Sequence, residues 1–450
     1  MPLNPITYKI IMMRNLMLFI ISGILTVLLA ACGTGRTDDP INSTPDQSGL
    51  LNEFIIMAYS GPPLEEVTLE RYREIAEARI EFLVPGNGTF SGEQNLRAMD
   101  LGAESGIRII PIDMRIMPFT LEKDVSIDTM AIRAIANDYK DHPAFAGYVI
   151  RDEPSGDLFA GLRDVCKIFR EEDPLHEPLI NLLPSYGSPT QLGFDDYRTY
   201  VRTYIETVKP GLLSYDNYAL REPVTWYNFW FNDLTIVREE TQKARIPFMV
   251  FMQSEGIRGH LHVPNRAEIL WQVNTALAYG AQGIGWFSYW TPAPDQGFPQ
   301  GDEAPPPLVE SHYDGMIDIN GKRTEVYDLV REANIYLKKA GKGILGWEST
   351  HVARYEGGQM VEGGSSPAVT PAGEEANIVI GTFRNGNRKR IVISNSSCEK
   401  PASFSLQVSS GWKIDGIFTS IDANPAGDMD SLLDWTMEPG GSVLLNLKPV

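Results

Sequence analysis

The chain has 450 residues, more than one hydrophobic core normally organises, so its length predicts two domains. Its composition, 43% hydrophobic and 10% aromatic, is that of a folded globular protein and argues against intrinsic disorder. A formal net charge of −19 argues against a nucleic-acid partner, because phosphates require basic patches, and suits neutral or cationic ligands.

Residues 1–31 have the pattern of a secretion signal, in which Arg14 precedes an apolar stretch too short and wrongly flanked for a spanning helix. The LAAC sequence at 29–32 resembles the lipobox of bacterial lipoproteins. That resemblance implies lipidation of Cys32 and a membrane-anchored location in the bacterial cell envelope. An ordinary signal peptide or anchor with an incidental cysteine is the alternative. Residues 32–50 are polar and rich in Gly, Pro, Ser and Asp, which predicts a flexible tether.

Apolar runs of strand length then alternate with segments of helical periodicity, such as 157–173 and 265–280. Eight strand–helix units predict parallel strands joined by helical crossovers, and their number and size favour a (β/α)8 TIM barrel over residues 51–342. An open doubly wound α/β sheet is the alternative. The eight runs begin at Phe54, Ile80, Ile107, Ala146, Pro178, Gly211, Pro247 and Gly283.

After Gly341 the pattern changes to short β-rich runs separated by turn residues, which predicts a small C-terminal β-sandwich over 343–450. Within it, the Gly-rich residues 356–375 predict a hairpin or a loop. Cys166 and Cys398 are far apart, so neither a disulfide framework nor a zinc-type cysteine spacing is expected.

Polar residues collect where the predicted barrel strands end, the side on which TIM-barrel enzymes carry their active sites. Because alternate strand residues face opposite sides, Arg151 and Glu153 are expected to share a side, as are Gln253 and Glu255, unless a bulge intervenes. The candidate site residues are Asp113, Arg151, Asp152, Glu153, Asp216, Asn217, Tyr218, Gln253, Glu255, Tyr289 and Trp290.

Two of these strand ends resemble a known family. "RDEP" at 151–154 and "QSEG" at 253–256 resemble the strand-four Asn-Glu-Pro motif and the strand-seven glutamate of clan A retaining glycoside hydrolases. Residues 314–334 also resemble the last barrel segment of β-galactosidase-like members. The resemblance implies that Glu153 is the acid/base and Glu255 the nucleophile in hydrolysis of an oligo- or polysaccharide. It implies substrate-binding roles for the other candidates, with Trp290 as a sugar platform, and no cofactor.

One position departs from that family. Asp152 stands where the clan usually has an asparagine that contacts the sugar 2-hydroxyl, so that contact is left unassigned. A second carboxylate beside Glu153 is expected to raise the pKa of Glu153, which suits a general acid.

Reaction chemistry supports the same pairing of carboxylates. Retaining hydrolysis needs two carboxyl groups about 5–5.5 Å apart across the scissile bond. Strands four and seven lie on opposite sides of an eight-stranded ring, so their ends can face each other across the barrel mouth. One carboxyl must be protonated and the other ionised, so their surroundings are expected to differ.

Each motif also has a purely structural interpretation. Glu153 with Pro154 could open a helix, and Glu255 could be a solvated loop carboxylate. Packing is the favoured interpretation of the aromatic cluster at 226–231. "HLH" at 260–262 lacks a third ligand at a suitable spacing, so no metal site is predicted. The alternative function is a glycan-binding lipoprotein that keeps the barrel without catalysis.

Overall fold

The computed structural model describes residues 50–87, 91–292, 312–364, 366, 368–419, 423–426 and 432–450. These residues belong to one compact unit that begins at Ser43. The predicted signal peptide, Cys32 and all of the tether except Leu50 lie outside the described residues. Within the described ranges, no helix is both long and apolar enough to cross a membrane.

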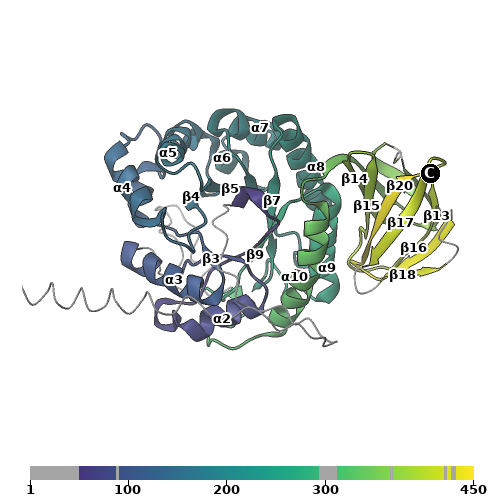
Figure 1. Ribbon diagram of the computed structural model, residues 1–450, viewed down its shortest axis with the longest axis horizontal. Coiled ribbons are helices and arrows are strands. Elements are labelled where there is room, and N and C mark those ends of the chain that lie inside the picture. The colour runs from purple at the N-terminus through teal and green to yellow at the C-terminus, as the bar shows by residue number, and fades with distance from the viewer. Residues whose placement is uncertain are drawn as a thin grey trace, which may run out of the picture. The chain divides into compact units, whose positions relative to one another are not determined.

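Eight parallel strands form a single curled sheet in the order β3-β2-β1-β9-β7-β6-β5-β4 (Figure 1). Bridges from Ile109 to Phe145 and from Ile112 to Val149 join β3 to β4, so the sheet closes on itself. The closed sheet confirms the TIM barrel and excludes the open sheet. The strands are β1 (Ile55–Tyr59), β2 (Phe82–Val84), β3 (Arg108–Ile109), β4 (Tyr148–Asp152), β5 (Pro178–Leu182), β6 (Leu213–Asp216), β7 (Phe248–Gln253) and β9 (Gly283–Phe287).

Helices surround the strands (Figure 1). In α5, the buried residues recur at helical spacing, with Phe159, Leu162, Cys166 and Phe169 on one face. The helices are α2 (Leu69–Glu77), α3 (Gly92–Ser105), α4 (Thr129–Tyr139), α5 (Phe159–Glu172), α6 (Pro189–Leu192), α7 (Tyr197–Val208), α8 (Tyr227–Ala244), α9 (Arg266–Tyr279) and α10 (Glu325–Ile344), with short 3-10 turns η1 (Leu50–Asn52), η2 (Leu64–Glu66), η3 (Met114–Phe119) and η4 (Gly156–Leu158).

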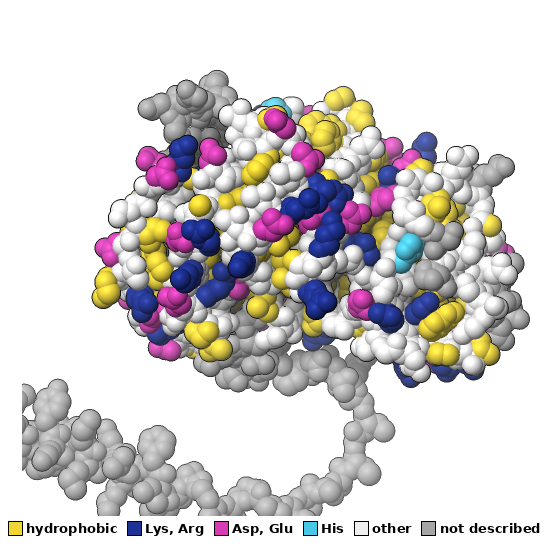
Figure 2. Space-filling view, turned by 90° about the horizontal axis from the view of Figure 1, so that it is seen from above, with side chains coloured by type: hydrophobic (Ala, Val, Ile, Leu, Met, Phe, Trp, Pro, Cys, Tyr) yellow, Lys and Arg dark blue, Asp and Glu magenta, His cyan; other side chains and the backbone are white. Residues whose placement is uncertain are grey.

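Basic and acidic side chains are interspersed on the face of the molecule that Figure 2 shows. Between α7 and α8, Glu240 accepts hydrogen bonds from Arg198, Arg202 and Lys243 while remaining 3% exposed. The hydrogen bond from Arg202 is the main cause that lowers the pKa of Glu240 to about 2. This carboxylate therefore links two adjacent helices of the outer ring.

The C-terminal region forms two antiparallel sheets, which confirms the β-sandwich. Their orders are β12-β11-β14-β15-β20-β17 and β13-β16-β19-β18. Strands β12 and β13 fall in the segment predicted as a hairpin or loop. The strands are β11 (Glu348–Glu356), β12 (Gln359–Gly363), β13 (Val369–Glu375), β14 (Ile378–Asn385), β15 (Arg388–Asn395), β16 (Ala402–Val408), β17 (Trp412–Thr419), β18 (Ala423–Ala426), β19 (Leu432–Met437) and β20 (Ser442–Pro449).

The larger of these sheets is buried on both faces at its central strand β14. Ile378 and Ile380 on β14 belong to the core inside the sandwich, whereas Val379 and Phe383 belong to the core shared with the barrel. Strand alternation separates these two sets, because successive side chains point to opposite faces of a sheet. The sandwich therefore has a core of its own and also contributes to the barrel core.

Helix α9 is the element on which the sandwich packs. It begins at a capping box formed by Asn265 and Glu268, and every residue from Glu268 to Tyr279 is buried. Trp271 Nε1 donates to a sandwich carbonyl at Ser396 over 3.0 Å, and Asn274 Nδ2 donates to Gly440 O over 2.8 Å. With partners on two sides, α9 has no polar outer face.

Candidate active site

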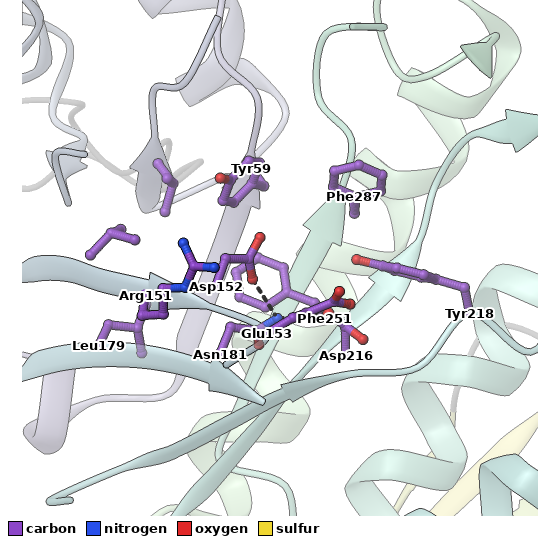
Figure 3. A pocket seen from close by; sticks show the side chains of 12 residues that line it. Tyr59, Arg151, Asp152, Glu153, Leu179, Asn181, Asp216, Tyr218, Phe251 and Phe287 are labelled. Carbon is purple, nitrogen blue, oxygen red and sulfur yellow. Dashed lines mark hydrogen bonds between the residues drawn. The ribbon is translucent and has the colours of Figure 1, made fainter. Parts of the chain in front are cut away.

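A cavity of about 190 Å³ opens at the carboxyl ends of the barrel strands (Figure 3). This is the end at which TIM barrels carry their active sites, so we take the cavity as the candidate active site. It is smaller than the roughly 300–1,000 Å³ of sites for drug-sized ligands, and so suits one small unit of a substrate. Its lining residues are Tyr59, Val84, Val149, Arg151, Asp152, Glu153, Leu179, Asn181, Asp216, Tyr218, Phe251 and Phe287.

The end of β4 turns three successive side chains, Arg151, Asp152 and Glu153, towards the cavity. Strict alternation would place Asp152 on the opposite side from its two neighbours. The pairing of β4 with β5 shifts register between Val149 and Arg151, and Glu153 adopts a left-handed backbone with φ of 45°. A shifted register and a left-handed residue both re-aim side chains, which explains why Asp152 reaches the cavity together with Arg151 and Glu153.

Three carboxyl groups share this cavity: Asp152 and Glu153 from β4, and Asp216 from β6. Asn181 on β5 lies between two of them, and its Nδ2 donates to Asp152 Oδ1 over 3.2 Å and to Asp216 Oδ2 over 2.7 Å (Figure 3). Burial raises the pKa of Asp152. Burial, followed by the charges of Glu153 and Asp152, raises the pKa of Asp216 well above its ordinary value.

Glu153 has a carboxyl group that can carry a proton near neutral pH. Burial of the carboxyl group is the largest cause that raises its pKa, to about 7, and the charge of Asp152 is the second. A hydrogen bond with Asp216 and the charge of Arg151 both lower this pKa. By surface area the residue as a whole is exposed at the rim. Of the neighbouring carboxyl groups, Asp152 acts in the same direction as burial and raises this pKa, whereas Asp216 acts against both.

Aromatic side chains form much of the remaining wall. The ring centroid of Phe287 lies 6.0 Å from that of Tyr59 and 5.4 Å from that of Tyr218, and Phe251 lies 6.2 Å from Tyr59. The hydroxyl of Tyr59 and Nε of Arg151 are buried without a hydrogen-bond partner among the described residues. Because buried polar atoms are normally paired, these two atoms are available to polar groups of a ligand.

Glu255, which follows β7, has a different environment. It is fully enclosed, at 0% exposed, and does not line the cavity. Ser288 Oγ donates to its Oε2, and His312 Nδ1 contacts its Oε1. Phe287 contacts both the cavity and the surroundings of Glu255. It lines the cavity and directly precedes Ser288, and its ring centroid lies 6.2 Å from that of His312.

The structure brings five predicted residues together in the cavity wall: Arg151, Asp152, Glu153, Asp216 and Tyr218. Asp113 and Asn217 lie outside the lining, and their polar groups are engaged elsewhere. Asp113 accepts hydrogen bonds from Tyr139 over 2.6 Å and from Arg115 over 2.7 Å. Asn217 Nδ2 donates to Asp233 over 2.7 Å.

Gln253, Tyr289 and Trp290 are also buried outside the lining. Gln253 Nε2 donates to the carbonyl of His262 over 2.6 Å and to that of Glu255 over 3.1 Å, so it fixes the loop after β7. Tyr289 is 0% exposed, and Trp290 is 3% exposed beneath a guanidinium group 5.1 Å from its ring centroid. A role of these three residues in sugar binding stays a prediction.

The structure also describes two other motifs of the sequence, the aromatic cluster at 226–231 and "HLH" at 260–262. In the aromatic cluster at 226–231, Trp230 and Phe231 are packed inside, whereas Trp226 and Phe229 remain 38% and 39% exposed. In the "HLH" motif, the Nε2 of His262 pairs with a carboxylate oxygen of Glu268 over 2.8 Å. Among the described residues, no group of three or more His, Cys, Asp or Glu side chains is placed to hold a metal ion.

Sequence reasoning missed four polar or aromatic residues of the cavity wall: Tyr59, Asn181, Phe251 and Phe287. Tyr59 and Phe287 are the last residues of β1 and β9, so strand ends were the signal that could have found them. Asn181 was missed because it lies inside β5 (Pro178–Leu182) and not among the polar residues after a strand end.

Comparison with known proteins identifies the fold. No family model and no curated protein sequence matches the chain. The structure is similar to a catalytic mutant of a GH42 β-galactosidase from G. stearothermophilus, with 9% identity, a TM-score of 0.54, and coverage of 90% of this chain and 100% of that one. It is also similar to a glycoside hydrolase family 5 protein from Bacteroides vulgatus, with 12% identity, a TM-score of 0.51, and coverage of 88% and 89%.

A third similar structure is the β-galactosidase from the psychrophilic Marinomonas ef1, with 12% identity and a TM-score of 0.47. The match covers 65% of this chain and spans 60% of that longer β-galactosidase. Fold and site together define a TIM-barrel protein with a C-terminal β-sandwich whose structural neighbours are glycoside hydrolases. A shared fold at such identities does not assign an activity, which must be argued from the site itself.

Proposed function

We propose that the protein is a retaining glycosidase that hydrolyses glycosidic bonds of an oligo- or polysaccharide. The observation that carries this proposal is the carboxyl group of Glu153 at the end of β4. It lies in an aromatic-walled cavity at the barrel mouth, and its pKa is raised to about 7. A carboxyl group that keeps its proton near neutral pH can act as a general acid in this type of hydrolysis.

In the proposed reaction, Glu153 gives its proton to the glycosidic oxygen as the bond from that oxygen to the anomeric carbon breaks. The carboxylate of Glu255 attacks the anomeric carbon and forms a covalent glycosyl-enzyme. Glu153, now ionised, takes a proton from water, and the resulting attack on the anomeric carbon releases the sugar with retained configuration. Ser288 and His312 supply donors that an ionised Glu255 can accept.

The second candidate function is glycan binding without catalysis. The enclosure of Glu255 favours it, because both carboxylate oxygens are engaged and the residue does not line the cavity. A retaining reaction requires the two carboxyl groups to act about 5–5.5 Å apart, with the anomeric carbon between them. The rival predicts binding of a glycan with no turnover.

A screen of aryl glycosides and polysaccharides separates these two functions. We expect the wild-type protein to hydrolyse at least one of them, and NMR of the first product formed to show retained anomeric configuration. Glu153→Ala and Glu255→Ala should both lose that turnover, whereas Glu65→Ala, an exposed glutamate on η2, should keep it. An inverted product would contradict the mechanism. Glycan binding without turnover by the wild-type protein would support the rival.

We also propose a location for the protein, supported by the sequence at 29–32. Cleavage before Cys32 and diacylation of that cysteine would anchor the protein to a membrane of the cell envelope, where it would meet its carbohydrate substrate. Two acyl chains hold a protein stably, whereas one holds it only marginally. Replacing Cys32 by Ser should release soluble protein or leave an unprocessed precursor. Mass spectrometry that finds an unmodified mature N-terminus elsewhere would contradict the proposal.

A further inference from the structure

We infer that His312 is a positioning residue for Glu255, holding its carboxylate in the orientation needed for attack on the anomeric carbon. This inference rests on the proposed function, in which Glu255 is the nucleophile. No motif connects the two residues, which lie 57 positions apart in the chain.

A short antiparallel ribbon brings His312 to Glu255. Strand β8 (Gly256–Ile257) pairs with β10 (His312–Tyr313), with His312 opposite Ile257 and Tyr313 opposite Gly256. A Cβ atom on Gly256 would lie 2.5 Å from the ring of Tyr313, so this approach requires glycine. The ribbon begins directly after Glu255, so its register determines where the imidazole lies relative to the carboxylate.

The contacts hold both oxygens of one buried carboxylate. His312 Nδ1 meets Oε1 of Glu255, and Ser288 Oγ meets Oε2. An ionised carboxylate only accepts hydrogen bonds, so we assign a proton to Nδ1 of His312. Loss of the histidine would leave Ser288 as the one side-chain donor to Glu255 among the described residues, and the carboxylate could then rotate.

The charges around His312 agree with this role. Burial alone would lower the pKa of His312, but the hydrogen bond and the charge of Glu255 raise it above its ordinary value. The other charged groups nearby, Arg258, Asp314 and Glu222, act on the neighbouring Tyr313. His312 therefore keeps its proton to a higher pH than a free histidine, and its support of an ionised Glu255 weakens as pH rises through that pKa.

The position of His312 predicts which kinetic constant it affects. Its ring packs 6.2 Å from Phe287, and it does not line the cavity. A residue that positions the nucleophile without touching substrate should affect the chemical step more than binding. Misplacement of a reacting group by about 1 Å can cost roughly 10²-fold in rate.

The kinetic test is His312→Gln in the full-length protein, assayed on the aryl glycoside that the wild-type protein hydrolyses. We expect kcat to fall roughly 10²-fold with KM changed by no more than about twofold. The matched control is His260→Gln, the same substitution at an exposed histidine in the loop after β8, which should leave both constants unchanged. An unchanged kcat in His312→Gln, with thermal unfolding like the wild type, would overturn the inference.

A second measurement does not depend on activity. The chain has six histidines, so NMR can follow each imidazole through a pH titration. We expect the pKa of His312 to lie above the ordinary histidine value in the wild-type protein and to fall in Glu255→Gln. A His312 titration that is the same in both proteins would overturn the pairing. If the pKa falls but no glycoside is ever hydrolysed, the proposed function fails and the positioning role fails with it.

Discussion

The ends of β4 and β7 each present a glutamate, yet the barrel gives the two side chains opposite surroundings. Glu153 lies at an open cavity among other carboxyl groups, and its pKa is raised to about 7. Glu255 is fully enclosed between a hydroxyl and an imidazole, both of which can donate to it. Like charges favour the protonated form of a carboxyl group, whereas donors favour the ionised form.

In the proposed mechanism, this contrast is what would let one residue type supply both the acid and the nucleophile. The difference does not come from the local sequence alone. Asp216 reaches Glu153 from β6 and lowers its pKa through a hydrogen bond, against the charge of Asp152, and His312 reaches Glu255 from β10. Each environment is thus completed by a residue far away in the chain, which only the fold brings close.

The largest expected effect comes from removing the enclosed carboxylate. Glu255→Ala should reduce kcat by roughly 10⁴-fold or more, because the covalent intermediate can no longer form. The measurement is turnover of an aryl glycoside together with mass spectrometry for a glycosyl-enzyme. Glu65→Ala is the matched control, and a Glu255→Ala variant that retains most of its activity would contradict the role of Glu255.

Removing the open carboxyl group should have a smaller and substrate-dependent effect. Glu153→Ala should lose roughly 10²–10⁴-fold, and less on substrates whose leaving groups need little protonation. Added azide should restore turnover by attacking the glycosyl-enzyme, giving a glycosyl azide of retained configuration. An equal loss on good and poor leaving groups would show that Glu153 is not the acid.

The pH dependence tests the same carboxyl group in the wild-type protein. Glu153 must be protonated to act as an acid, and its raised pKa of about 7 keeps it so below that pH. We therefore expect kcat/KM to fall as pH rises through about 7. In Asp152→Asn, one neighbouring charge is lost, so the pKa of Glu153 should fall and the decline should move to lower pH. Asp157→Asn, at an exposed aspartate on η4, should leave the profile unchanged.

The smallest expected effect concerns stability. The pKa of Asp216 is raised well above its ordinary value in the folded protein, so folding favours its protonated form, and the stability this contributes is lost as pH rises. Asp216→Asn replaces the carboxyl group with an amide that does not become charged at high pH. The substitution should therefore raise Tm by roughly 2–4 °C at pH 8, with little change at pH 4. Calorimetry at both pH values measures the shift, and an equal shift at the two would contradict this account.

Much of the fold could be predicted from the sequence because it follows from local patterns. Alternating apolar runs and amphipathic segments predicted the barrel, and the change of pattern after Gly341 predicted the sandwich. The polar residues at strand ends, including Glu153, Asp216 and Tyr218, indicated where the cavity would lie. These features depend on residues that are close in sequence.

What the sequence could not predict depends on register and on distant contacts. Simple alternation could not place Asp152 at the cavity, because the shift in the β4–β5 pairing and the left-handed Glu153 are properties of the folded backbone. Asn181 joins two carboxyl groups from different strands, a contact that exists only because β5 lies between β4 and β6 in the folded barrel.

The burial of α9 from Glu268 to Tyr279 has a consequence for anyone who wishes to shorten this protein. A barrel cut off after α10 would present the sandwich-facing side of α9 to water, including the indole of Trp271 and the amide of Asn274 that now bind sandwich carbonyls. Val379, Phe383 and Leu444, which complete the barrel's core, would leave with the removed segment. Such a fragment would tend to self-associate, so a soluble minimal version would need new polar residues along α9.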